Sequence, residues 1–104
     1  MLRVYEDALV MVRDVYRVAR AVERGDRDLA RQMKRSSSSV ALNISEGQYG
    51  RKGTRLARWH DAMGSANETR SALQVAGAVQ LASPTPELLD RLDKIVATLW
   101  KLTR

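Results

Sequence analysis

Hydrophobic residues recur along most of the chain at intervals of four and three, the spacing that places side chains on one face of an α-helix. Near the N-terminus one such row runs from Val4 to Val22, and a second row from Tyr5 to Ala19 widens the apolar face. A face this wide is more than one neighbouring helix usually covers. The pattern predicts a first helix over about residues 5–24, ended by Gly25.

Four consecutive serines interrupt the next segment, KRSSSSVALNISEG at residues 34–47, and could mark a flexible linker or a phosphate-binding loop. The apolar spacing passes through them in phase from Leu29 to Ile44, and no Gly-Lys-Ser/Thr sequence follows a strand. We therefore predict a second helix over about residues 28–47, capped by Asp26 or Asp28. The serines are expected to face partly into a helix contact, with their hydroxyls donating to backbone carbonyls.

A third, long helix is expected over about residues 54–81, with Thr54 as its N-terminal cap. Its small residues between Ala62 and Ala66 would let another backbone approach closely. Its predicted core positions are Trp59, Met63, Ala66, Leu73, Ala76 and Val79. The Thr85-Pro86-Glu87 sequence is a strong start signal for a fourth helix, over about residues 86–103.

No stretch of the sequence shows the alternating pattern of a β-strand. Four helices joined by short loops predict an all-α, up-down-up-down four-helix bundle. A chain of 104 residues suits one domain, residues 1–104. It has no cysteine, no signal peptide and no long uncharged run, so we expect a cytoplasmic protein without a membrane segment.

The net charge of +6 is unevenly distributed along the sequence. Thirteen cations accompany seven acids up to Arg58, whereas five cations accompany five acids after it. This asymmetry favours a polyanionic partner, and a solubilising surface is the alternative. No aromatic platform is evident beside the cations, so we expect recognition of phosphates and shape rather than of bases. The candidate nucleic-acid-binding residues are Arg13, Arg17, Arg20 and Arg24 in one helical stripe, then Arg27 and Arg31, and finally Arg51, Lys52, Arg55 and Arg58 around a glycine-interrupted basic turn, GQYGRKG.

Little in the sequence indicates catalysis. His60 is the only histidine, and no cluster of carboxylates suits metal ions, so we expect no metal, no cofactor and no enzymatic activity. Glu46 and Glu68 are the best candidates for partly buried carboxylates. We expect them to form a structural polar network with Asn43, Gln32 and Arg35 rather than a general acid–base pair.

The segment RSSSSVALNISEG, Arg35 to Gly47, resembles the central motif of the bacterial four-helix-bundle proteins encoded within 23S rRNA intervening sequences. That motif typically reads QLRRAAxSIPxNIAEG. The matching residues are Gln32, Arg35, Ser39, Asn43, Ile44, Glu46 and Gly47. The segment AMGSANE, with Gly64 and Glu68, resembles a second family segment, and the chain departs from the family pattern where Leu42 replaces the usual proline.

The resemblance implies a protomer that assembles into a homopentameric barrel. It also implies kinship with the accessory variability determinant of diversity-generating retroelements, whose basic surfaces bind RNA and a reverse transcriptase. Five copies of this chain would carry a charge of about +30, which would attract nucleic acid in a salt-dependent way. Two hypotheses follow: a non-enzymatic module that binds structured RNA, or a scaffold that recruits a partner enzyme such as a reverse transcriptase.

Overall fold

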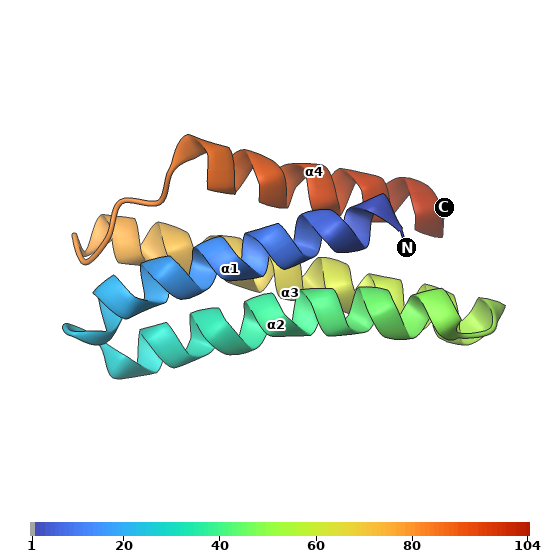
Figure 1. The fold of residues 1–104 in the computed structure, drawn as a ribbon, viewed down its shortest axis with the longest axis horizontal. Coiled ribbons are helices and arrows are strands. Elements are labelled where there is room, and N and C mark those ends of the chain that lie inside the picture. The colour runs from blue at the N-terminus through green and yellow to red at the C-terminus, as the bar shows by residue number, and fades with distance from the viewer. Residues whose placement is uncertain (1) are drawn as a thin grey trace.

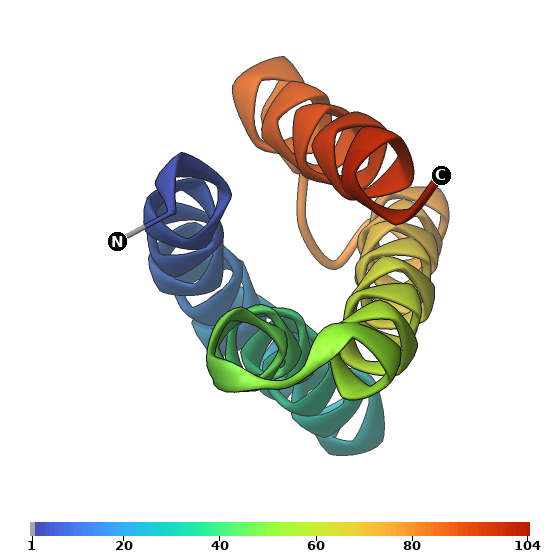
Figure 2. The ribbon, with the colours of Figure 1, turned by 90° about the vertical axis from the view of Figure 1, so that its right-hand side faces the viewer.

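The computed structural model describes residues 2–104, and within that range the protein contains four α-helices and no strand. The helices are α1 (Arg3–Glu23), α2 (Arg27–Tyr49), α3 (Lys52–Ala78) and α4 (Pro86–Thr103). They run alternately up and down along a body of 42 × 22 × 20 Å (Figure 1). Seen along its axis, α1 and α3 each lie beside both α2 and α4 (Figure 2). The prediction of an all-α protein with four helices is confirmed.

The core is built from the faces that the four-three spacing predicts. On α1 every fourth or third residue is buried, in the series Val4, Ala8, Met11, Val15, Ala19 and Val22. On α2 the buried series includes Leu29, Met33, Ser37, Val40 and Ile44, so the helix does continue through the serines. Several buried positions of α3 are alanines, and small side chains allow the backbones of neighbouring helices to approach closely.

The serine stretch forms a polar seam between α2 and α3. Ser36 and Ser37 are buried, and their hydroxyls donate to the carbonyls of Met33 and Lys34 at 3.4 and 3.1 Å. Thr69 Oγ1 lies 2.8 Å from both Ser36 Oγ and the carbonyl oxygen of Ser65. Because each of these buried hydroxyls has a partner, the seam avoids the cost of burying an unsatisfied polar group.

The helix boundaries differ from the predicted ones around the basic turn. Asp26 and Thr85 cap α2 and α4, accepting hydrogen bonds from backbone N–H groups at 2.9 and 3.1 Å. The prediction that Thr54 caps the third helix is wrong, because α3 already begins at Lys52 and no side chain caps it. Since α2 extends to Tyr49 and Gly53 lies within α3, only Gly50 and Arg51 remain between the helices.

The third helix ends at Ala78 rather than at residue 81, because Gln80 adopts a left-handed backbone conformation with φ of 62°. The N–H of Gln80 donates to the carbonyl of Gly77, and the N–H of Leu81 donates to that of Ala76, at 3.1 and 2.9 Å. This pair of bonds is the Schellman motif that closes many helices. Val79, a predicted core residue, is therefore turned into solvent and is 56% exposed.

Candidate nucleic-acid interface

The basic turn between α2 and α3 is anchored by a buried tryptophan. Trp59 of α3 donates from Nε1 to the carbonyl of Ile44 on α2, at 3.2 Å. Its indole lies so close to Gly47 that a Cβ added there would be 2.4 Å from Trp59 Nε1. A side chain at residue 47 would have to displace the ring, so glycine is required by the approach of the indole rather than by a turn.

Arg55, one of the predicted nucleic-acid-binding cations, closes the C-terminal end of α2. Its guanidinium donates to three carbonyls within the last residues of α2 and the turn, those of Gly47, Gln48 and Gly50, at 3.2 to 3.4 Å. It also lies over the Trp59 ring, 5.6 Å from its centre. The Gly47 carbonyl also accepts from the Gly50 N–H, so Arg55 adds a second donor there. A cation at this position also complements the negative end of the helix dipole. Sequence analysis missed this structural role.

Arg51 and Lys52 project from the turn that these contacts hold. Both are exposed, and neither has an ion-pair partner among residues 2–104. Because no side chain caps α3, its first N–H groups face solvent at the positive end of the helix dipole. Arg58, nearly two turns further into α3, instead pairs with Glu46 at 3.2 Å. The turn therefore combines free cations with a helix terminus that attracts anions.

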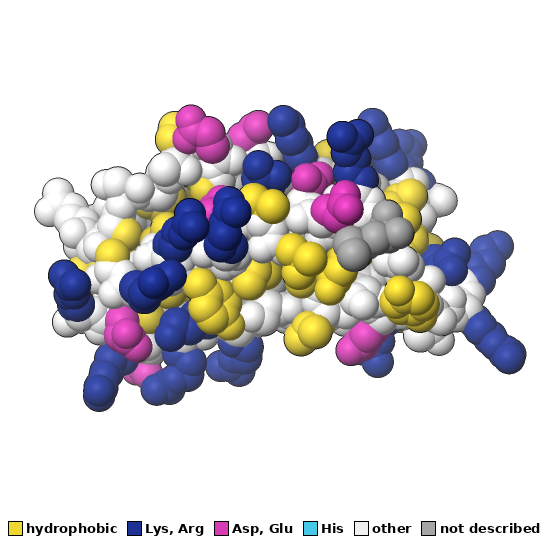
Figure 3. Space-filling view, viewed as in Figure 1, with side chains coloured by type: hydrophobic (Ala, Val, Ile, Leu, Met, Phe, Trp, Pro, Cys, Tyr) yellow, Lys and Arg dark blue, Asp and Glu magenta, His cyan; other side chains and the backbone are white. Residues whose placement is uncertain are grey.

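The cations of α1 and early α2 form a separate group that begins midway along α1, at Arg13, and extends to the opposite end of the bundle. Arg13 and Arg17 both pair with Asp14, and Arg31 pairs with Asp28. In the part of the chain that the structure describes, three of the predicted cations at this end are exposed without an ion pair: Arg20, Arg24 and Arg27. The 23 residues of α2 separate them from the α2–α3 turn, a length of about 34 Å. The predicted basic residues are thus divided between two ends, and Figure 3 shows hydrophobic side chains along the face between them.

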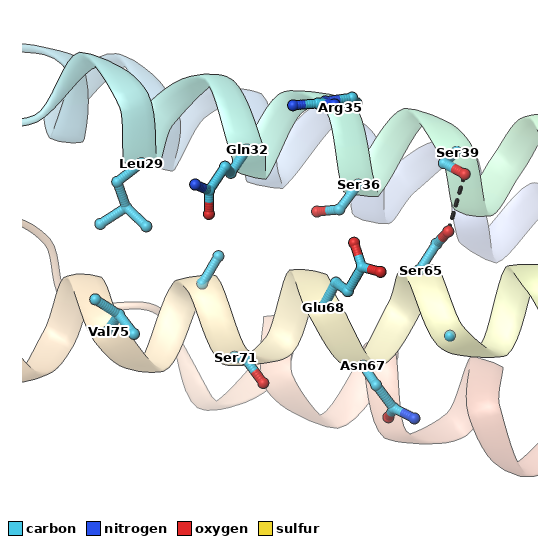
Figure 4. A pocket seen from close by; sticks show the side chains of 12 residues that line it. Leu29, Gln32, Arg35, Ser36, Ser39, Ser65, Asn67, Glu68, Ser71 and Val75 are labelled. Atoms are coloured by element: carbon cyan, nitrogen blue, oxygen red, sulfur yellow. Dashed lines mark hydrogen bonds between the residues drawn. The ribbon is translucent and has the colours of Figure 1, made fainter.

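Five of the family-motif residues lie along a groove of about 870 Å³ between α2 and α3 (Figure 4). Gln32 and Glu68 point into the groove from opposite helices. Small side chains line its floor, where Ser39 Oγ lies 2.9 Å from Ser65 Oγ. The five residues are Gln32, Arg35, Ser39, Gly64 and Glu68. No atom lies within 4 Å of a Cβ built on Gly64, so this glycine serves no close contact within the protomer.

The predicted polar network is only partly formed. Asn43 donates from Nδ2 to the carbonyl and hydroxyl oxygens of Ser39, both at 3.0 Å. Glu46 and Glu68, expected to be partly buried, are both exposed, because they lie on the rim of the α2–α3 contact rather than inside it. Glu46 binds Arg58, and within the described residues no hydrogen bond joins Gln32, Arg35 and Glu68 to one another.

A model of the 23S rRNA-intervening sequence protein family matches residues 1–101. The chain belongs to this family. The fold is also that of a crystal structure, at 1.70 Å resolution, of a protein of unknown function from the S23 ribosomal protein family of Bacteroides thetaiotaomicron, with a TM-score of 0.86. The two sequences are 18% identical, and the alignment covers 97% of this chain and 98% of the other. No curated protein matches the sequence.

Membership of the 23S rRNA-intervening sequence family confirms the resemblance found in the Arg35–Gly47 motif. Neither this family nor the structural neighbour is described by an enzymatic activity. The one histidine, His60, is exposed on α3, and no group of three metal-binding side chains is assembled anywhere in residues 2–104. Over the same range, no helix is long and apolar enough to cross a membrane.

Proposed function

We propose that this protein binds structured RNA through contacts between exposed cations and phosphates, and that it catalyses no reaction. The α2–α3 turn is the observation that carries the proposal, because Arg51 and Lys52 are exposed beside an uncapped helix N-terminus. The family is also described by its link to 23S rRNA intervening sequences, which would bring such a protein close to ribosomal RNA in the cytoplasm.

We further propose that the RNA-binding form is a homopentamer. An exposed apolar band on α1 and α2 supports assembly, since Leu9, Tyr16 and Leu42 leave large hydrophobic surfaces in solvent. A ring of copies would bury this band against a different face of the next protomer and would repeat the free cations five times. Light scattering tests the assembly: we expect a pentamer at micromolar concentration, and Leu9→Arg should shift it toward the protomer. A wild-type protomer at that concentration would refute the ring.

A gel-shift titration with structured RNA at rising salt tests the binding proposal. Each neutralised phosphate contributes a slope of about 0.7 to 0.9 in a plot of log affinity against log salt. The double variant Arg51→Gln/Lys52→Gln should therefore lower the slope by roughly 1.4 to 1.8 for each protomer of the ring that contacts the RNA. A matched control, Arg91→Gln/Lys94→Gln, removes the same charge from two ion-paired cations of α4 and should leave the slope nearly unchanged. Absence of binding even at low salt would refute the proposal.

A second candidate function is an accessory subunit that recruits an enzyme such as a reverse transcriptase, by analogy with the accessory variability determinant. The same exposed apolar band favours it, because a protein partner could cover Leu9, Tyr16 and Leu42. The two functions differ in their response to the loss of these cations. Binding of a protein to the apolar band would survive the Arg51→Gln/Lys52→Gln exchange, whereas RNA binding would weaken.

A further inference from the structure

The last residue of α2, Tyr49, is the most exposed large hydrophobic side chain among the described residues, at 82% of its full accessible surface. The other exposed aromatic side chains are held by partners. Tyr16 lies under Lys34 and shares a hydrogen bond with Ser38, and Trp100 lies under Arg104. Within residues 2–104 no hydrogen bond or cation contact engages the Tyr49 ring. Both faces of a large aromatic ring are therefore left in water.

The surroundings of Tyr49 are basic rather than apolar. Gly50 alone separates it from Arg51 and Lys52 along the sequence, and no acidic residue occurs between Gly47 and His60. Nothing lies within 4 Å of a Cβ built on Gly53, so the space in front of the first turn of α3 is open. The nearest exposed apolar residue on the same helical face, Leu42, lies seven residues earlier, about 10.5 Å along α2. Tyr49 is thus an aromatic side chain set among free cations.

We propose that Tyr49 is a stacking platform for an unpaired nucleobase, and that Arg51 and Lys52 hold the phosphates on either side of that nucleotide. The proposal rests on the RNA-binding function proposed above and specifies its ligand: a single-stranded loop or bulge of a structured RNA. Unpaired bases stack on aromatic side chains, whereas a base inside a duplex offers no free face. The proposal departs from the sequence-based expectation that no aromatic platform accompanies the cations, because the exposed ring of Tyr49 lies at the end of α2, beside the basic turn.

Two RNAs with the same stem and the same number of phosphates provide the test, one carrying an unpaired loop and the other fully paired. Tyr49→Ala should weaken binding of the looped RNA by about 5- to 150-fold, the usual effect of removing one stacking partner. Its affinity for the paired RNA should not change. Tyr49→Phe keeps the ring and should bind both RNAs like the wild type. Because Tyr49 is exposed, neither variant should change the melting temperature, which thermal unfolding would check.

The possible results separate this inference from the proposed function. If Tyr49→Ala binds the looped RNA as well as the wild type, while Arg51→Gln/Lys52→Gln lowers the salt slope, the platform is refuted and phosphate binding stands. If Tyr49→Phe loses as much affinity as Tyr49→Ala, the hydroxyl and not the ring makes the contact, which also refutes stacking. If the wild type binds neither RNA at low salt, the RNA-binding function itself fails. Loss of a protein partner from Tyr49→Ala with RNA binding unchanged would assign the ring to a protein interface instead.

Discussion

Replacing Gly47 by alanine sets two effects of opposite sign against each other. Alanine is the better helix former, by about 0.8 to 1 kcal/mol in a helix interior and by less near the end of α2. The new Cβ, however, would lie 2.4 Å from Trp59 Nε1 and 2.5 Å from Cδ1. Both distances are shorter than any that a Cβ normally adopts to a neighbouring heavy atom. The indole would have to move, and its hydrogen bond to the Ile44 carbonyl would be strained or lost.

The steric effect should prevail. Overpacking a well-packed site costs about 1 to 3 kcal/mol, and a lost hydrogen bond costs about 0.5 to 1.5 kcal/mol more. After subtraction of the helix-propensity gain, we expect Gly47→Ala to lower the free energy of unfolding by about 1 to 3 kcal/mol. For a domain of this size each kcal/mol lowers the melting temperature by roughly 4 to 8 °C, which calorimetry or circular dichroism would measure at fixed protein concentration.

Two matched variants make this prediction specific. Gly53→Ala adds the same methyl group to α3 where no atom lies within 4 Å, so it should raise stability by about 0.4 to 1 kcal/mol. In a Trp59→Ala background no ring remains to clash with the new Cβ, and adding Gly47→Ala should then be neutral or stabilising relative to Trp59→Ala alone. If Gly47→Ala instead stabilises the wild-type protein as much as Gly53→Ala does, the close approach of Trp59 is not what restricts residue 47.

Three further predictions follow from the helix ends and from one ion pair. Gln80→Gly should stabilise the fold by about 1 kcal/mol in urea unfolding, because glycine adopts the left-handed conformation without strain, whereas Gln80→Ala should gain nothing. Thr85→Ala should cost about 1 kcal/mol by removing a cap, and Thr54→Ala, which removes none, should be close to neutral; equal losses would contradict the assigned start of α3. A hydrogen bond from Arg70 lowers the pKa of Asp93, so this pair stabilises the fold above the ordinary aspartate pKa of about 3.9 and ceases to do so as the pH falls through the lowered value. The difference in melting temperature between wild type and Asp93→Asn should accordingly disappear in acid, and a difference independent of pH would exclude the ion pair as its source.

The sequence predicted the helices well because burial follows the helical period over long segments. From Leu29 to Ile44 each residue of the predicted core row is buried, including Ser37. From Val4 to Val22 the predicted row is buried except at Val18, which is only partly buried, and Ala19 of the flanking row takes its place in the core. A serine at a core position did not disrupt the pattern, since the hydroxyl donates to the carbonyl one turn earlier within the same helix. Local periodicity was sufficient here because each helix presents a single face to the core.

The boundaries and the site were harder to predict because they depend on contacts between helices. Glycines normally interrupt helices, yet Gly47 lies inside α2. A glycine is needed at this position because the Trp59 indole occupies the space that a Cβ would fill. Arg55 looks like a free cation in the sequence, and only the fold shows that it binds the end of α2. The exposure of Tyr49 likewise follows from where α2 ends, and helix ends are poorly specified by sequence patterns.

The contacts that hold the basic turn are also local in sequence, which bears on how the protein folds. The hydrogen bonds from Arg55 to Gly47 and from Trp59 to Ile44 span 8 and 15 residues, whereas the bond from Arg91 to Asp7 joins α4 to α1 across 84. Short loops close with little loss of chain entropy, so contacts of this kind form fast. We therefore expect the adjoining ends of α2 and α3 to associate before α1 and α4 dock, and to keep their amide hydrogens protected when the contact between α1 and α4 opens. The segment that displays the free cations would then be among the first parts of the chain to acquire its native shape.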